Sequence, residues 1–146
     1  TTFVALYAAD DGVYIAHVGD SRCYRFRNNK LEALTEDHSL LNDYIKMKRL
    51  TQKEIDDFPH KNVIVRALGM KDTVKVDTRH EVPEVGDLFL LCSDGLAGPA
   101  SDNEIEEILQ NSSGDIQATT KALIDKANSN GGPDNITAVL VHWTGA

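Results

Sequence analysis

The amino-acid sequence predicts a single layered α+β domain, on three observations. Short β-rich runs separated by tight turns open the chain, polar segments with apolar residues at helical spacing follow, and two further helical segments precede a closing apolar strand. This order of strands first and helices later is typical of α+β folds. At 146 residues and 41% hydrophobic content, the chain is long enough for one domain with a sizeable core.

Two hairpins are predicted at the start of the chain. Residues 2–9 and 13–18 are β-rich and are joined by an Asp-Asp-Gly turn at 10–12, where Asp and Gly tolerate the positive φ angles of tight turns. Residues 23–26 and 31–34 flank a second segment of turn-forming composition. The beginning of the chain is therefore predicted to be an antiparallel meander.

Residues 36–62 are predicted to be a helical insert between strands. The segment is polar, carries charges of both signs, and has apolar residues at helical spacing between positions 40 and 47. Thr51-Gln52-Lys53-Glu54 has the form of a capping box, which starts a short helix that Pro59 ends. We expect two short helices on the surface.

The remainder of the chain is predicted to mix extended and helical segments. One helix is expected after a cap at Ser101-Asp102, with acids in its first turn, and a second helix is expected from about residue 114, with an apolar face along it. The predicted segments are extended pieces at 63–65 and 73–82, a buried strand at 88–92, helices at 103–109 and about 114–129, and a final strand at 135–143.

Charge and composition exclude several classes of function. The formal net charge of −8, with scattered Lys and Arg, argues against nucleic-acid binding. Cys23 and Cys92 have neither zinc-site spacing nor the density of a disulfide scaffold, so buried free thiols are expected. The opening residues resemble neither a signal peptide nor a membrane span. We expect a cytoplasmic monomer, and the start inside a strand, without Met, suggests a piece of a longer protein.

Three acids stand at turns that adjoin apolar strands. Asp20 follows the run 15–18, Asp94 follows the run 88–92, and Asp134 precedes the run 138–141. Clustered carboxylates repel one another unless cations neutralise them. Mg²⁺ or Mn²⁺ suits an all-oxygen donor set, whereas the five histidines show no ligand-like spacing.

Each candidate residue has a plainer interpretation. Asp94 in Ser-Asp-Gly, taken alone, is typical of a turn residue that ends a strand, and Asp134 could be a turn residue after Gly-Gly-Pro. Asp20 could accept backbone hydrogen bonds in a β-turn, with Arg22 pairing with a carboxylate. For His38, a structural role, capping the following helix or pairing with its neighbour Asp37, is favoured over general-acid catalysis.

Five motifs together carry a specific resemblance. In order and rough spacing they are similar to those of the metal-dependent type 2C serine/threonine protein phosphatases, over essentially the whole chain. The motifs are Val18-Gly19-Asp20-Ser21-Arg22, Leu34-Thr35-Glu36-Asp37-His38-Ser39, Arg66-Ala67-Leu68-Gly69, the run from Gly86 to Leu96 that contains Ser93-Asp94-Gly95, and Asp134-Asn135-Ile136-Thr137.

The resemblance implies a fold, a reaction and a set of ligands. The fold would be an α-β-β-α sandwich of antiparallel sheets flanked by helices, incomplete here because the family's amino-terminal part is missing. Two Mg²⁺ or Mn²⁺ ions would share a water that attacks phosphoserine or phosphothreonine in proteins that a cognate kinase phosphorylates. Asp94 and Asp134 match ligands of the second core ion, and Asp20 with Asp94 matches an accessory third site. The insert at about 36–62 resembles the family's flap.

The chain also departs from the family pattern. The phosphate-binding Arg and the Asp-Gly-x-Gly-Gly segment, whose Asp bridges both core ions, do not occur in it, so we expect the fragment alone to be inactive. Lys48 stands where the family usually has Gly, which puts the flap's shape in doubt. The alternative function is a catalytically inactive, phosphatase-like binding or regulatory module.

Overall fold

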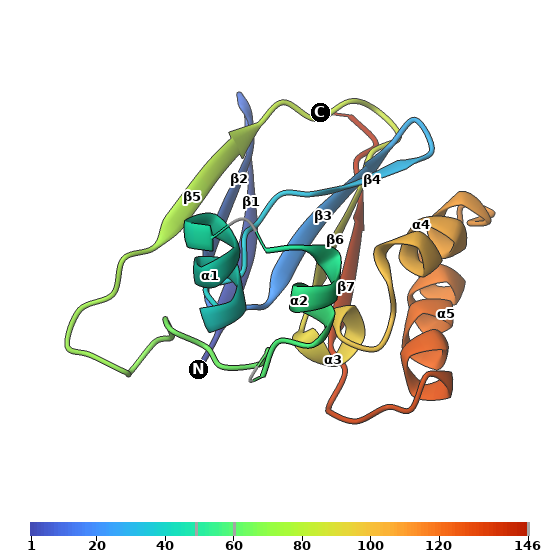
Figure 1. Ribbon diagram of the computed structural model, residues 1–146. Coiled ribbons are helices and arrows are strands. Elements are labelled where there is room, and N and C mark those ends of the chain that lie inside the picture. The colour runs from blue at the N-terminus through green and yellow to red at the C-terminus, as the bar shows by residue number, and fades with distance from the viewer. Residues whose placement is uncertain (49, 60, 146) are drawn as a thin grey trace.

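Two antiparallel sheets stack face to face, and a pair of helices covers the outer face of one of them (Figure 1). The computed structural model describes residues 1–48, 50–59 and 61–145. The three-stranded sheet has the order β1-β2-β5 and the four-stranded sheet the order β4-β3-β6-β7. The strands are β1 (Phe3–Ala9), β2 (Gly12–Val18), β3 (Arg22–Arg27), β4 (Lys30–Ala33), β5 (Asp77–Glu81), β6 (Leu88–Cys92) and β7 (Ala138–His142).

Both predicted hairpins are confirmed. β1 pairs with β2 from Phe3↔Val18 to Ala9↔Gly12, and β3 pairs with β4 across a two-residue turn. In that turn Asn28 and Asn29 have φ angles of 51° and 60°. Positive φ at both central residues matches the right-handed twist of the flanking strands, which explains why Asn is used twice.

Alternation along the strands fills two separate cores. Cys23 and Phe89 face the space between the sheets, where they pack with Val13 and Ile15. Their neighbours along β3 and β6 face the opposite way and pack against α4 (Asp102–Gln110) and α5 (Ile116–Ser129). The members of this second core are Tyr24, Phe26, Leu90, Cys92, Leu96, Ala100, Ile105, Leu109, Leu123, Ala127 and Leu140. Because β6 is buried on both faces, its sequence is a continuous apolar run.

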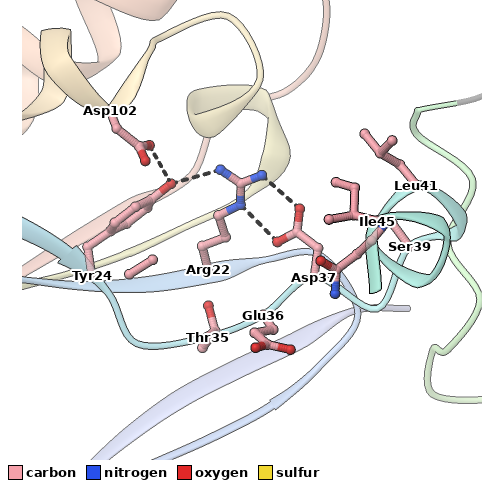
Figure 2. Close-up of a pocket in the computed structure, with 11 residues that line it drawn as sticks. Arg22, Tyr24, Thr35, Glu36, Asp37, Ser39, Leu41, Ile45 and Asp102 are labelled. Carbon is pink, nitrogen blue, oxygen red and sulfur yellow. Dashed lines mark hydrogen bonds and ion pairs between the residues drawn. The ribbon is translucent and has the colours of Figure 1, made fainter. Parts of the chain in front are cut away.

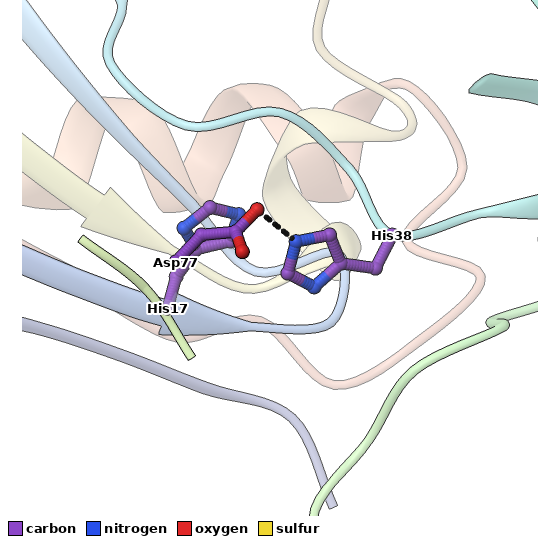
Figure 3. A group of neighbouring side chains, drawn as sticks. All are labelled: His17, His38 and Asp77. Carbon is purple, nitrogen blue, oxygen red and sulfur yellow. Dashed lines mark hydrogen bonds and ion pairs between the residues drawn. The ribbon is translucent and has the colours of Figure 1, made fainter. Parts of the chain in front are cut away.

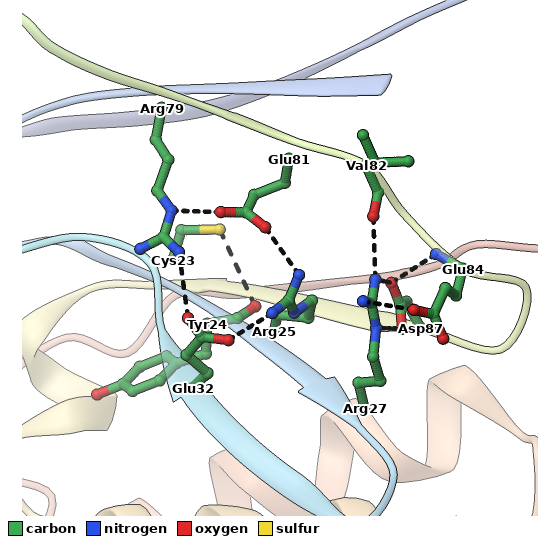
Figure 4. Close-up of polar contacts among 10 residues, drawn as sticks. All are labelled: Cys23, Tyr24, Arg25, Arg27, Glu32, Arg79, Glu81, Val82, Glu84 and Asp87. Carbon is green, nitrogen blue, oxygen red and sulfur yellow. Dashed lines mark hydrogen bonds and ion pairs between the residues drawn. The ribbon is translucent and has the colours of Figure 1, made fainter. Parts of the chain in front are cut away.

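Charged side chains connect the two sheets at one edge (Figure 4). Arg25 of β3 donates to Glu81 of β5 at 2.8 Å and to Glu32 of β4 at 2.5 Å. Nearby, Arg27 forms two bonds to the buried carboxylate of Asp87, of 2.8 and 2.6 Å. Burial acts to raise the pKa of Asp87, but the bonds from Arg27 and from a backbone N–H outweigh it, so the pKa lies below its ordinary value.

The predicted insert contains two short helices, α1 (Leu40–Lys48) and α2 (Gln52–Asp56). The capping box is confirmed: Thr51 accepts from the backbone N–H of Glu54, and the Glu54 carboxylate accepts from the backbone N–H of Thr51 at 2.7 Å. Lys48 ends α1 as a helical residue, and its ammonium lies 5.6 Å from the centre of the Tyr44 ring. Arg49 and His60, also in the predicted insert, lie outside the described residues.

Several predicted boundaries are wrong. Residues 63–65, expected to be extended, bond to residues 38–40 around an isolated bridge between Ile64 and Ser39 but belong to no strand of either sheet. β5 covers only the last part of the predicted 73–82 segment, and β7 begins at Ala138 instead of residue 135. The three residues before β7 turn toward the strand end at Ser93 and bond to it there. A short helix, α3 (Asp94–Ala97), follows β6 where the sequence predicted only a turn.

Three layers of the sandwich occur in the described part of the chain. From left to right in Figure 1 they are the three-stranded sheet, the four-stranded sheet and the pair α4 and α5. Neither α1 nor α2 buries a residue, and the outer face of β1 and β2 exposes Phe3, Tyr7 and Tyr14. Among the helices described, none is long and apolar enough to cross a bilayer.

Candidate metal centre

A tightly held turn after β2 presents Asp20. Gly19 has a φ of +109°, and a Cβ at that position would lie 2.5 Å from Cγ2 of Thr2, so only glycine fits. The hydroxyl oxygens of Ser21 and Thr2 are 3.0 Å apart. With its neighbours packed in this way, Asp20 has only 9% of its surface exposed.

Arg22 is paired, as the plainer interpretation of this motif predicted (Figure 2). Its Nε and Nη2 donate to the two carboxylate oxygens of Asp37 at 2.8 and 2.7 Å, and its Nη1 donates to the Tyr24 hydroxyl at 2.9 Å. That hydroxyl donates in turn to Asp102 at 3.1 Å. The bonds that Arg22 donates to Asp37 raise the pKa of Arg22, which therefore stays charged and engaged with Asp37.

Asp20 and Asp94 line one pocket of about 250 Å³. Asp94 is the first residue of α3, directly after β6. Burial, and secondarily the charge of Asp94, raise the pKa of Asp20 above its ordinary value. Among the contacts of the described residues, neither carboxylate takes part in an ion pair or a side-chain hydrogen bond. Arg22 and Lys61 also line this pocket, and Arg22 is paired with Asp37.

The backbone that carries Asp134 packs directly against the start of α3. A Cβ on Gly95 would lie 2.1 Å from the carbonyl oxygen of Asn135, so the absence of a side chain permits this approach. Around it, Ser93 N–H donates to the carbonyl of Thr137 at 3.1 Å, and Thr137 N–H donates to the Ser93 hydroxyl at 3.0 Å. The residues flanking Asp94 thus contact the residues that follow Asp134.

The third predicted acid, Asp134, is exposed on its loop. One carboxylate oxygen of Asp134 accepts from the N–H of Asn135 at 2.7 Å, and the loop begins with Gly131 and Gly132, which have φ angles of 119° and 49°. The structure therefore brings the backbones of the Asp94 and Asp134 loops together, and places the carboxylates of Asp20 and Asp94 at one pocket.

A second polar cluster, His17, His38 and Asp77, was not foreseen from the sequence (Figure 3). Gly19 N–H donates to Nδ1 of His38 at 3.0 Å, so Nε2 of the neutral ring carries the proton and donates to Asp77 at 2.9 Å. Arg66 donates to the other oxygen of Asp77 at 2.8 Å. His38 therefore presents a proton, not a lone pair, to Asp77, which disfavours metal binding at this cluster.

Within this cluster the side chain of His38 is buried and held by its neighbours. Its ring is 6% exposed and stacks on the His17 ring with centroids 4.5 Å apart. Burial is the main cause that lowers the pKa of His38. The predicted pairing with Asp37 is wrong, because Asp37 binds Arg22 and the partner of His38 is Asp77. These residues are 39 positions apart, and no local spacing signal connects them.

The carboxylates of Asp20 and Asp94, which line one pocket, suit a hard divalent cation, because Mg²⁺ or Mn²⁺ binds through one or two carboxylates together with waters. Asp134 is not among the residues that line this pocket. Both cysteines are buried elsewhere: burial raises the pKa of each thiol to about 12. His17 and His38 are engaged in the hydrogen bonds of the second cluster.

The two stacked antiparallel sheets, with α4 and α5 on one outer face, define an α+β sandwich domain. The family model described as "Protein phosphatase 2C" matches residues 1–141, and the chain belongs to this family. It is 43% identical over 141 residues to the serine/threonine phosphatase stp of Listeria welshimeri, an alignment that covers 97% of this chain and 56% of that protein. The chain thus spans little more than half the length of this relative.

Solved structures show the same fold. The S. agalactiae serine/threonine phosphatase superposes with a TM-score of 0.89 at 35% identity, over 97% of this chain and 59% of that one. The catalytic domain of the serine/threonine protein phosphatase PstP, solved "in complex with 2 Manganese ions", superposes with a TM-score of 0.78 at 34% identity, over 95% of this chain and 56% of that one. These matches confirm the predicted family and fold class.

Proposed function

We propose that this chain supplies metal-binding carboxylates to a metal-dependent serine/threonine protein phosphatase. Asp94 and Asp134 would hold a core Mg²⁺ or Mn²⁺ ion, and Asp20 with Asp94 would hold an accessory ion. The observation that carries the proposal is the direct contact of the Asp94 and Asp134 loops at Gly95, beside a pocket that Asp20 shares.

The family relationship supports the reaction. The stp and S. agalactiae proteins are named serine/threonine phosphatases, and one structural neighbour is described with manganese. A bound Mg²⁺ or Mn²⁺ would supply an activated water and neutralise charge on the phosphoryl oxygens.

The residues of this chain would build and protect the site. Gly95 lets the Asp134 loop approach the start of α3. The guanidinium of Arg22 pairs with Asp37 and not with Asp20 or Asp94, so these two carboxylates would be free of Arg22 and could bind a cation. Because a metal ion would neutralise Asp20 and Asp94, it would remove the repulsion that raises the pKa of Asp20.

The substrates and setting follow from the same proposal. The substrates would be proteins phosphorylated on Ser or Thr by a cognate kinase, and the ions would be two in the core with a possible third. A cytoplasmic location and a monomeric state remain predictions from the sequence, as does the assignment of residues 36–62 as a flap.

Single substitutions in the full-length protein test the proposal. Asp94→Asn and Asp134→Asn keep the shape of the side chain but remove its charge, and each is expected to lower Mn²⁺-dependent hydrolysis of a phosphothreonine peptide by at least roughly 100-fold in kcat/KM. Asp125→Asn, an exposed acid on α5 paired with Lys121, is the matched control and should leave turnover unchanged.

Two results would contradict the proposal. Native turnover by either variant would exclude that carboxylate as a ligand. Binding of phosphopeptide without turnover by the native full-length protein would favour the alternative, an inactive binding or regulatory module. The 146-residue chain alone is expected to show no turnover.

A further inference from the structure

His38 is bonded twice to the residue immediately before Asp20. Its backbone N–H donates to the carbonyl of Gly19 at 3.0 Å, and its Nδ1 accepts from the N–H of Gly19 at 3.0 Å. Both polar groups of the Gly19 backbone are therefore satisfied by one residue, 19 positions later in the chain. Because Gly19 has no side chain of its own, these bonds determine how the turn is oriented.

The His38 ring is itself held from its other side. Its Nε2–H donates to Asp77 at the start of β5, and Arg66 fixes that carboxylate through a 2.8 Å bond. Nη1 of Arg66 also lies 3.0 Å from Nε2, but both atoms carry protons, so the bond of Arg66 goes to Asp77. The His17 ring stacks against His38, and its Nε2 bonds to the carbonyl of Glu36 at 2.8 Å.

We infer that His38 and Asp77 are positioning residues for Asp20. The series of bonds from Asp77 through His38 to Gly19 fixes the backbone one residue before the Asp20 carboxylate, and so aims that carboxylate into the pocket it shares with Asp94. The inference rests on the proposed role of Asp20 as a ligand of the accessory cation. Supporting groups of this kind orient metal ligands although they never touch the ion.

A structural role alone would predict something different. If His38 only satisfied the buried N–H of Gly19, its loss would lower stability and leave metal affinity in the folded protein unchanged. A positioning role predicts weaker binding at the Asp20 site in protein that remains folded.

Two substitutions at His38 separate the two ring nitrogens. His38→Asn keeps an acceptor near the position of Nδ1, and His38→Gln keeps a donor near the position of Nε2. Mn²⁺ binding is measured by calorimetry, and thermal unfolding without metal is measured beside it. Asp20→Asn first identifies which Mn²⁺-binding step depends on Asp20.

The expected result is a roughly tenfold weaker Asp20-dependent step in His38→Gln. A smaller loss is expected in His38→Asn, which retains the bond to Gly19, and in Asp77→Asn, which only loosens the ring. If His38→Gln does not fold, Asp77→Asn carries the test, because its side chain is partly exposed and keeps its shape.

Asp87→Asn is the matched control. Asp87 is a buried acid paired with Arg27 in the turn before β6, while Asp94 follows the other end of that strand. This variant should lose stability without changing any Mn²⁺ step. Equal weakening in Asp87→Asn, or an unchanged Asp20-dependent step in both His38→Gln and Asp77→Asn, would overturn the inference. If Asp20→Asn itself leaves every Mn²⁺ step unchanged, the proposed metal role of Asp20 is wrong, and the inference falls with it.

Discussion

Gly95 is the position where a single methyl group should separate the two residues that we propose as ligands of a core ion, Asp94 and Asp134. A Cβ there would lie 2.1 Å from the carbonyl oxygen of Asn135, whereas ordinary van der Waals contact begins near 3.4 Å, so in Gly95→Ala the Asp134 loop must move by about 1.3 Å. Metal sites require their ligands to be held within about 0.5 Å. We therefore expect Gly95→Ala to weaken Mn²⁺ binding by roughly 10-fold to 100-fold.

Gly95→Ala should also lower the free energy of unfolding. Gly95 lies in a helix, where alanine is favoured by about 1 kcal/mol, so the loss must come from the overlap, which typically costs about 1–3 kcal/mol. Calorimetric titration with Mn²⁺ and urea unfolding measure the two effects. Gly86→Ala is the control: Gly86 has a φ of +99° with open space around it, so it should lose about 1–2 kcal/mol by strain and bind Mn²⁺ normally. Native Mn²⁺ affinity in Gly95→Ala would show that Mn²⁺ binding does not depend on the close approach of the Asp134 loop to Gly95.

Three further predictions concern stability and reactivity. The hydrogen bond from His38 is the main cause that lowers the pKa of Asp77 to about 2, so the contribution of the ionised Asp77 to stability is present above pH 4 and is lost as the pH falls toward 2. Urea unfolding across this range should show a smaller loss of stability in Asp77→Asn than in the native protein. An equal loss would contradict the pairing of His38 with Asp77. Because burial raises the pKa of Cys23 and Cys92 to about 12, a thiol reagent at pH 8 should label neither in the folded protein and both in denaturant, and rapid labelling of the native protein would be the opposing result. Ser101→Ala removes the N-cap of α4 and should cost about 1 kcal/mol in urea unfolding; no change would mean that the cap contributes nothing there.

The parts of the fold that depend on local signals were predictable from the sequence. The Asp10-to-Gly12 turn, the Thr51 capping box and the Ser101 cap act within a few residues, so the hairpin and the starts of α2 and α4 lie close to where the sequence predicted them. β6 was equally clear, because burial on both faces requires a continuous apolar run.

Tertiary contacts determined what the sequence missed. α3 begins where Gly95 lies against the Asn135 carbonyl, and β7 begins only at Ala138, after the residues that make this contact. The partner of His38 could not be predicted from its sequence neighbours. Asp37 pairs with Arg22, and Asp77, which accepts the bond from His38, lies 39 positions further along the chain, in β5. The acids themselves were marked by strand-adjacent turns, but the contact between the loops of Asp94 and Asp134 joins residues that are distant in the sequence.

We propose that the carboxylates of Asp94 and Asp134 coordinate one divalent cation. Anomalous diffraction from crystals of the protein grown with Mn²⁺ would locate the ion directly. We predict a peak within roughly 2 Å of an oxygen of each carboxylate, the distance of direct coordination. A peak at His17, His38 and Asp77 with none between Asp94 and Asp134 would show that Asp94 and Asp134 do not bind the cation.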